Sequence, residues 1–164
     1  MERSIISSRV DPKDCIFCRI VKRELPAYIV YEDTKYIAFL DKAPFSEGHT
    51  LVCPKEHGET IWDMNEQDIG GLFMIASRLS KAIVDAMQAD GFRFVQNNGE
   101  AANQVVAHVH VHVVPVKKDD KGKMMGRIKI SEDKMKDIAD KITTKINNMN
   151  RISFRSLKNL EYPV

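Results

Sequence analysis

Three histidines alternate with valines in the run His108-Val-His-Val-His112, which continues as Val-Val-Pro. Because side chains of a β-strand point alternately to its two faces, the histidines share one face of a strand. Val109, Val111 and Val113 share the other face and can pack on a core. Histidine is not a favoured strand residue, so packing does not explain three of the chain's five histidines at this spacing. The run therefore predicts a strand with a chemically active face.

Strand geometry limits what these histidines can do together. Neighbouring side chains on one face lie about 6.7 Å apart, and the first and third about 13 Å apart. Zinc–nitrogen bonds are only about 2.0–2.1 Å long, so all three do not converge on one ion. Nucleophilic attack on phosphorus needs one free ring nitrogen, a second ring nitrogen held as a donor, and donors for the phosphate oxygens. His110 is best placed for this chemistry because it has a histidine on each side.

The rest of the chain alternates strand and helix patterns. A helix begins after Asn65, which can act as its N-cap, and ends near Gly91. A second helix follows Ser131. Strands are expected at residues 28–31, 35–40, 50–53, 92–96 and 105–114. The short connections predict an α+β fold, with an antiparallel five-stranded sheet and a central and a C-terminal helix on one side of it.

Composition narrows the class of protein. The 164 residues fit one domain, divided here into a flexible N-terminal segment (1–13), the domain itself (14–149) and a C-terminal tail (150–164). A formal net charge of +2 gives no case for nucleic acid as a partner. No apolar run approaches the roughly 18 residues that cross a membrane, so we expect a soluble cytoplasmic protein with no membrane partner.

Three cysteines are an odd number and form no disulfide framework. The pair Cys15-Ile-Phe-Cys18 has a spacing typical of metal or redox sites.

The sequence resembles the histidine-triad (HIT) family, and its nearest likeness is to the Hint-like and bacterial or archaeal HIT hydrolases. Besides the histidine run, the segments that carry the resemblance are Cys15–Ile20, Glu24–Ala27, Ala38–Asp41, Gly48–Val52, Pro54–Lys55 with His57, and Gln96–Ala101. The resemblance implies a HIT-like fold. It also implies a hydrolase that cleaves nucleoside phosphoramidates, adenylylated compounds or dinucleoside polyphosphates at the α-phosphorus, without a catalytic metal.

The resemblance assigns the catalytic roles. His110 is the nucleophile and forms a covalent nucleotidyl-histidine that water hydrolyses to a nucleoside monophosphate. His112 contacts the phosphate or the leaving group, and the backbone carbonyl of His108 holds the ring of His110. His49 joins this network and relays a proton.

The resemblance also assigns a purine nucleotide site. Asp41 matches the position that binds the ribose hydroxyls, and its alternative is a turn residue at a strand end. Phe17 and Ile20 match positions that line the base pocket, with core packing as their alternative. Lys42 stands where an apolar residue is common in the family.

The loop before the histidine run departs from the family pattern. The common Gly-Gln-Ser/Thr reads Asn103-Gln104-Val105 here, so the glycine and the phosphate-binding hydroxyl are replaced. Asn97 and Gln104 remain as polar donors to a nucleotide phosphate. Asn103 and Val105 occupy family positions of the nucleotide site, so we include them among the predicted nucleotide-binding residues.

Some HIT proteins bind a structural zinc ion, and the resemblance places its ligands at Cys15, Cys18, His57 and His108. A Cys₂His₂ set is a closed tetrahedral site, suited to structure rather than to catalysis. A rival set replaces His108 with Cys53, which falls in a predicted buried strand.

Two other functions stay open at this point. One is a nucleotidyl transferase, in which a phosphate compound rather than water resolves the intermediate. The other is a nucleotide-binding or signalling module with little turnover, an alternative that the altered loop keeps open. The resemblance also implies a homodimer joined through the central helix and an edge strand.

Overall fold

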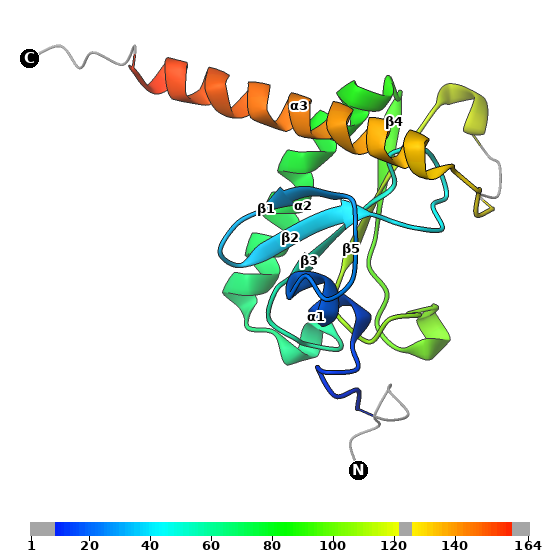
Figure 1. The fold of residues 1–164 in the computed structure, drawn as a ribbon. Helices are drawn as coiled ribbons and strands as arrows, with labels where there is room; N and C mark the ends of the chain where they lie inside the picture. Colours follow the sequence, from blue (N-terminus) through cyan, green and yellow to red (C-terminus); the bar gives the residue numbers. More distant parts are fainter. Residues whose placement is uncertain (1–8, 122–125, 159–164) are drawn as a thin grey trace, which may run out of the picture.

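Five antiparallel strands form one sheet in the spatial order β1-β2-β3-β5-β4 (Figure 1). The computed structural model describes residues 9–121 and 126–158. The predicted α+β fold is confirmed. The strands are β1 (Ile29–Glu32), β2 (Tyr36–Leu40), β3 (Thr50–Pro54), β4 (Gly91–Val95) and β5 (Val111–Val116).

The two predicted helices begin where their capping residues stand. Helix α2 (Glu66–Met87) follows Asn65, whose side chain accepts a hydrogen bond from the backbone of Asp68. Helix α3 (Glu132–Lys158) follows Ser131 and runs beyond residue 149, into the predicted C-terminal tail. Both helices pack on the same face of the sheet.

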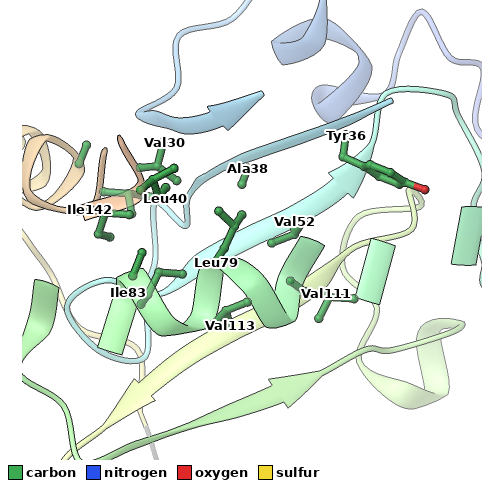
Figure 2. Packing of buried hydrophobic residues seen from close by; sticks show 14 of the residues in the cluster. Val30, Tyr36, Ala38, Leu40, Val52, Leu79, Ile83, Val111, Val113 and Ile142 are labelled. Atoms are coloured by element: carbon green, nitrogen blue, oxygen red, sulfur yellow. The ribbon is translucent and has the colours of Figure 1, made fainter. Parts of the chain in front are cut away.

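The valine face of the histidine run lies in the core between the sheet and these helices. Figure 2 shows Val111 and Val113 in one cluster with Leu79 and Ile83 of α2 and Ile142 of α3. The two valine side chains are fully buried, and each contributes about 1.5–3 kcal/mol relative to an exposed position. A slip of one residue would turn the histidines into this core, so the burial of the valines fixes which face the histidines take.

Strand β5 corrects the predicted strand at 105–114, because it begins at Val111 and ends at Val116. The backbone before it bonds elsewhere. The N–H of Val109 donates to the carbonyl of Gly58 at 2.7 Å, and the N–H of His108 donates to Val106 at 2.8 Å. The alternation of side chains nevertheless continues upstream, since Val109 is buried in the same core as Val111.

A third helix, α1 (Ile16–Val21), covers the opposite face of the sheet, where the sequence analysis expected none. Its six residues are too few to show helical periodicity, and no side chain caps its first turn. It closes a second apolar cluster with the sheet, made of Cys15, Phe17, Cys18, Ile20, Ile37, Phe39, Leu51 and Cys53. The active face of the histidine run lies on this side.

The N-terminal segment is described from residue 9 onward, and residues 1–8 of the predicted 1–13 segment lie outside the described residues. Arg9 Nη1 lies 2.8 Å from Asp63 Oδ1, and the N–H of Val10 donates to the Glu59 carboxylate. Among the described helices, none has the length and apolar character needed to cross a membrane.

Candidate active site and metal site

A cavity of about 990 Å³ lies beside the histidine run, on the α1 side of the sheet. His110 and His112 line it, together with apolar residues of α1. Six of the seven predicted nucleotide-binding residues also line it: Phe17, Ile20, Asp41, Asn97, Asn103 and Val105. The cavity is within the 300–1,000 Å³ typical of small-molecule sites.

His110 is held in one orientation and one tautomer. Its Nδ1 lies 2.6 Å from the backbone carbonyl of His108, which can only accept a hydrogen bond. Nδ1 therefore carries the proton, and Nε2 keeps a free lone pair. Burial lowers the pKa of His110 below its ordinary 6.5, so the ring is neutral at pH 7. The edge of the Phe17 ring packs against it, with centroids 5.2 Å apart.

Two successive hydrogen bonds, from Phe45 to His49 and from His49 to His112, fix the protons of both histidines. The N–H of Phe45 donates to His49 Nδ1 at 3.1 Å, so the His49 proton sits on Nε2. His49 Nε2 then donates to His112 Nδ1 at 2.9 Å, which leaves the His112 proton on Nε2. The His112 ring lies 4.8 Å from the His110 ring between centroids. His112 thus offers an N–H donor beside the lone pair of His110.

Both members of this pair are neutral at pH 7. Burial lowers the pKa of His49 to about 4, although the Asp41 carboxylate acts in the opposite direction. Burial, followed by the neighbouring His110 and His49, lowers the pKa of His112 to about 3. Two imidazole rings joined by a hydrogen bond can pass a proton from one to the other.

Asp41 lies at one end of the cavity, and its side chain is only 13% exposed. Its Oδ1 accepts a hydrogen bond from the N–H of Ala43 at 2.9 Å, which fits the alternative prediction that Asp41 is a turn residue at a strand end. Its Oδ2 lies 3.5 Å from His49 Nδ1 and 3.4 Å from Arg127 Nη1. The carboxylate is therefore held by the turn and also borders the cavity, so the two interpretations are compatible.

We expected the Gln104 side chain to face a bound phosphate, but in the structure it bonds within the loop before the histidine run. The Gln104 side chain is buried; its Oε1 accepts from the N–H of Gly99 at 2.7 Å, and its Nε2 donates to the carbonyls of Glu59 and Val106. Gln104 is not among the residues that line the cavity. Its amide braces the loop, while Val105 stands 83% exposed at the cavity.

The second cluster brings together Cys15, Cys18, His57 and His108, whose ligand atoms all lie within 4.8 Å of one another. Cys15 Sγ lies 3.4 Å from His108 Nδ1, and Cys18 Sγ lies 3.3 Å from His57 Nδ1 and 3.6 Å from His108 Nδ1. Bonds of about 2.3 Å to sulfur and 2.0–2.1 Å to nitrogen at tetrahedral angles separate S and N ligands by about 3.6 Å. These four residues could hold a metal ion.

The tautomer of His108 agrees with that use. His108 Nε2 lies 2.8 Å from the carbonyl of Pro54, so Nε2 carries the proton and Nδ1 faces the thiols as an acceptor. Burial, and then the neighbouring Cys15, raise the pKa of the Cys18 thiol to about 12, so a metal ion would have to displace the proton of this thiol when it binds. Cys53 is buried and is not part of the group of four.

Two residues that the sequence analysis did not single out contribute to the cavity. Phe45 supplies the N–H that orients His49, and Arg127 reaches the same end of the cavity as Asp41. Arg127 follows a stretch of chain without helix or strand pattern, so no spacing in the sequence connected it to the histidines.

Comparison with known proteins agrees with this geometry. The model of the HIT domain family matches residues 22–119, which is more than half of the chain. The chain belongs to the histidine-triad (HIT) family.

Three HIT relatives illustrate the likeness. The adenosine 5′-monophosphoramidase HNT1 of Saccharomyces cerevisiae is 40% identical over 112 residues, 68% of each chain. The adenylylsulfatase HINT3 of Arabidopsis thaliana is 36% identical over 115 residues, 70% of this chain and 58% of that protein. A crystal structure of a zinc-bound histidine triad family protein from Mycobacterium smegmatis superposes with a TM-score of 0.78 at 29% identity, over 87% of this chain and 99% of that one.

Proposed function

We propose that this HIT protein hydrolyses purine nucleotide conjugates at the α-phosphorus through a covalent nucleotidyl-His110 and releases a nucleoside monophosphate. The protein is an enzyme of the histidine-triad nucleotide hydrolase class. The observation that carries the mechanism is the 2.6 Å hydrogen bond from His110 Nδ1 to His108 O, because it leaves Nε2 free beside a nucleotide-sized cavity. The named activities of the yeast and plant relatives favour phosphoramidates and adenylyl sulfate as substrates, with adenylylated compounds and dinucleoside polyphosphates in the same class.

In the first step, the lone pair of His110 Nε2 attacks the α-phosphorus, and the bond to the leaving nitrogen or oxygen breaks with its electron pair. A bound phosphate anion, together with Asp41, favours one extra proton on the His49–His112 pair. His112 Nε2–H passes this proton to the leaving group. His110 then carries the nucleotidyl group, and its Nδ1–H still donates to the His108 carbonyl.

In the second step, water attacks the same phosphorus and gives its proton to the His49–His112 pair. The bond between phosphorus and His110 Nε2 breaks, and its electron pair returns to the ring. One water is consumed, one nucleoside monophosphate leaves, and all three histidines regain their starting protonation. The relay therefore gives a proton in the first step and takes one back in the second.

The cavity suits a nucleotide along its whole length. The apolar side chains of Phe17 and Ile20 offer a surface for the base, and Asp41 can accept from the ribose hydroxyls. His110 and His112 then meet the α-phosphate. We therefore propose that the base binds under α1 and that the reacting phosphorus lies at the histidine run.

A second function, nucleotide binding with little turnover, is favoured by the loop alone. Gln104 is committed to bracing the loop, and Val105 presents methyl groups where a hydroxyl would donate to phosphate. The loop therefore offers fewer donors for the charge that grows in the transition state.

We also propose that the group of four ligands holds a structural zinc ion. The S–N distances of 3.3–3.6 Å and the outward proton of His108 support this ion. When bound, zinc would tie α1 to the start of the histidine run through Cys18 and His108. All four tetrahedral positions would be filled by protein, so the ion would serve stability.

The edge strand β4 and helix α2 support the proposed homodimer. Phe92, Phe94 and Val95 of β4 and Phe73 and Met74 of α2 are exposed apolar side chains. β4 pairs only with β5 among the described strands, so its other edge is open to a second copy. Sedimentation of the wild-type protein and of a Phe94→Glu variant tests the homodimer. A dimeric wild type together with a folded, monomeric variant would support it. A monomeric wild type would contradict it.

Turnover of adenosine 5′-monophosphoramidate by wild type and His110→Ala tests the proposed function. The wild type should release AMP, and the variant should lose hydrolysis while AMP still binds, since only the nucleophile is removed. Near-wild-type turnover by a clean His110→Ala preparation would defeat the mechanism. In the other outcome, the wild type binds AMP but hydrolyses none of the phosphoramidate, adenylyl sulfate and a dinucleoside polyphosphate. That result would favour the nucleotide-binding module.

A further inference from the structure

Two cationic side chains, Lys42 and Arg127, line the cavity at the end where Asp41 lies. Asp41 is the one carboxylate among the described residues that line the cavity. Apart from the histidines, the charged groups of the lining therefore give this end a net positive charge before any ligand enters. A ribose is uncharged and does not use this excess.

The head of Arg127 is held in place by the loop that follows β2. The N–H of Ile128 donates to the carbonyl of Pro44 at 2.8 Å and ties the Arg127 backbone to this loop. Arg127 Nη1 donates to the carbonyl of Ala43, and its guanidinium carbon lies 4.9 Å from the centroid of the Phe45 ring. These contacts order the guanidinium even though 45% of the side chain is exposed.

Arg127 keeps donors for a ligand. Both of its hydrogen bonds, to Ala43 and to Asp41, are made by Nη1, and Nε and Nη2 make none with the described residues. A guanidinium carries five N–H donors in a planar fork that matches phosphate and sulfate. Asp41 balances one cation of this end, so the charge of the second, Lys42, is left for an anion.

We propose that Lys42 and Arg127 form an anion subsite that takes a phosphoryl or sulfuryl group which the substrate carries in addition to its α-phosphate. The inference rests on the proposed function, because that function places the ribose at Asp41 and the α-phosphate at His110. The additional anion has two possible sources. It is either a phosphate on the 2′ or 3′ hydroxyl of the ribose or the anionic leaving group beyond the α-phosphate.

Calorimetric titration with stable ligands tests the subsite and separates the two sources. The ligands are AMP, adenosine 2′,5′-bisphosphate, adenosine 3′,5′-bisphosphate and the methylene-bridged analogue of ADP. The wild type should bind at least one of the last three about tenfold more tightly than AMP, as expected for one charge-assisted contact. Preference for a bisphosphate assigns the subsite to ribose phosphates, and preference for the ADP analogue assigns it to the leaving group.

Variants identify the residues responsible. Arg127→Gln should abolish the preference, so that its affinities for AMP and for the ligands with a second phosphate become equal within about twofold. Lys42→Gln should reduce the preference independently, and it covers the case in which Arg127→Gln does not fold. Lys118→Gln, an exposed lysine whose charge lies outside the cavity lining, is the matched control and should bind as wild type.

Equal affinity of the wild type for all four ligands would overturn the subsite. So would an Arg127→Gln variant that loses affinity for AMP and for the ligands with a second phosphate to the same degree, because Arg127 would then only position Asp41. The same preparations are assayed with adenosine 5′-monophosphoramidate. Hydrolysis without an anion preference defeats the subsite alone, and an anion preference without hydrolysis defeats the proposed function alone.

Discussion

Replacement of Cys18 by serine should remove zinc and lower stability far more than it impairs the chemistry of the histidines. Cys18 Sγ contacts both histidine ligands, His57 at 3.3 Å and His108 at 3.6 Å, so its loss opens the centre of the site. These distances match the roughly 3.6 Å separation of S and N ligands around zinc. Little rearrangement is needed to bind the ion.

The size of the effect follows from linkage. An ion that binds only the folded state stabilises it by about 4 kcal/mol when its free concentration is about 1,000 times its Kd. For a domain of this size each kcal/mol shifts Tm by about 2–4 °C, so loss of zinc should lower Tm by about 8–16 °C. A chelator should lower the Tm of the wild type by this amount and leave the Tm of Cys18→Ser unchanged.

Elemental analysis of protein purified without chelators provides the direct assay, beside thermal melts with and without chelator. Cys53→Ser is the matched control, because Cys53 is also buried but lies outside the group of four. The wild type and Cys53→Ser should each contain one zinc per chain. A wild type without zinc would refute the site, as would zinc that survives Cys15→Ser combined with Cys18→Ser. Zinc lost with Cys53→Ser but kept with His108→Ala would establish the rival ligand set instead.

Three further predictions follow from the cavity and the buried histidines. Asp41→Ala should weaken AMP binding by about 1.5–3 kcal/mol but leave 2′,3′-dideoxy-AMP unaffected, since only AMP has the two hydroxyls; equal losses in calorimetry would make Asp41 structural. Val105→Ser should raise turnover of the phosphoramidate by at most about tenfold, because it restores one neutral hydrogen bond to phosphate, and unchanged or lower turnover would show another loop arrangement. Stability to urea should fall as pH drops from about 6.5 to about 4, because protonation of His49 favours the unfolded chain, where its pKa is 6.5 rather than about 4. That pKa difference corresponds to about 3 kcal/mol, and a His49→Gln variant with an equally steep pH dependence would contradict this origin.

The features that could be predicted from the sequence are those with a period or a local signal. The alternation of the histidine run placed three valines in the core, and Asn65 marked the start of α2. The spacing of Cys15 and Cys18 indicated a metal or redox site, and the family resemblance supplied the two histidines that the structure places beside them.

The features that escaped prediction depend on long-range contacts. The strand β5 starts late because Val109 bonds to Gly58, fifty-one residues away in the chain. The sequence suggested Gln104 as a donor to phosphate. In the structure its side-chain amide instead accepts a hydrogen bond from the N–H of Gly99 and donates one to the carbonyl of Glu59. Arg127 reaches Asp41 across 86 residues, and no local pattern encodes that approach.

Detection of the nucleotidyl group on His110 tests the central claim most directly. Wild-type enzyme is mixed with adenosine 5′-monophosphoramidate, quenched in alkali within the first turnover and digested for peptide mass analysis. The account predicts an adenylyl group on the peptide that contains His110, located on that residue and formed before AMP appears in solution. An adenylyl group on His112 or His49, or AMP formed in the first turnover with no enzyme-bound adenylyl group, would contradict it.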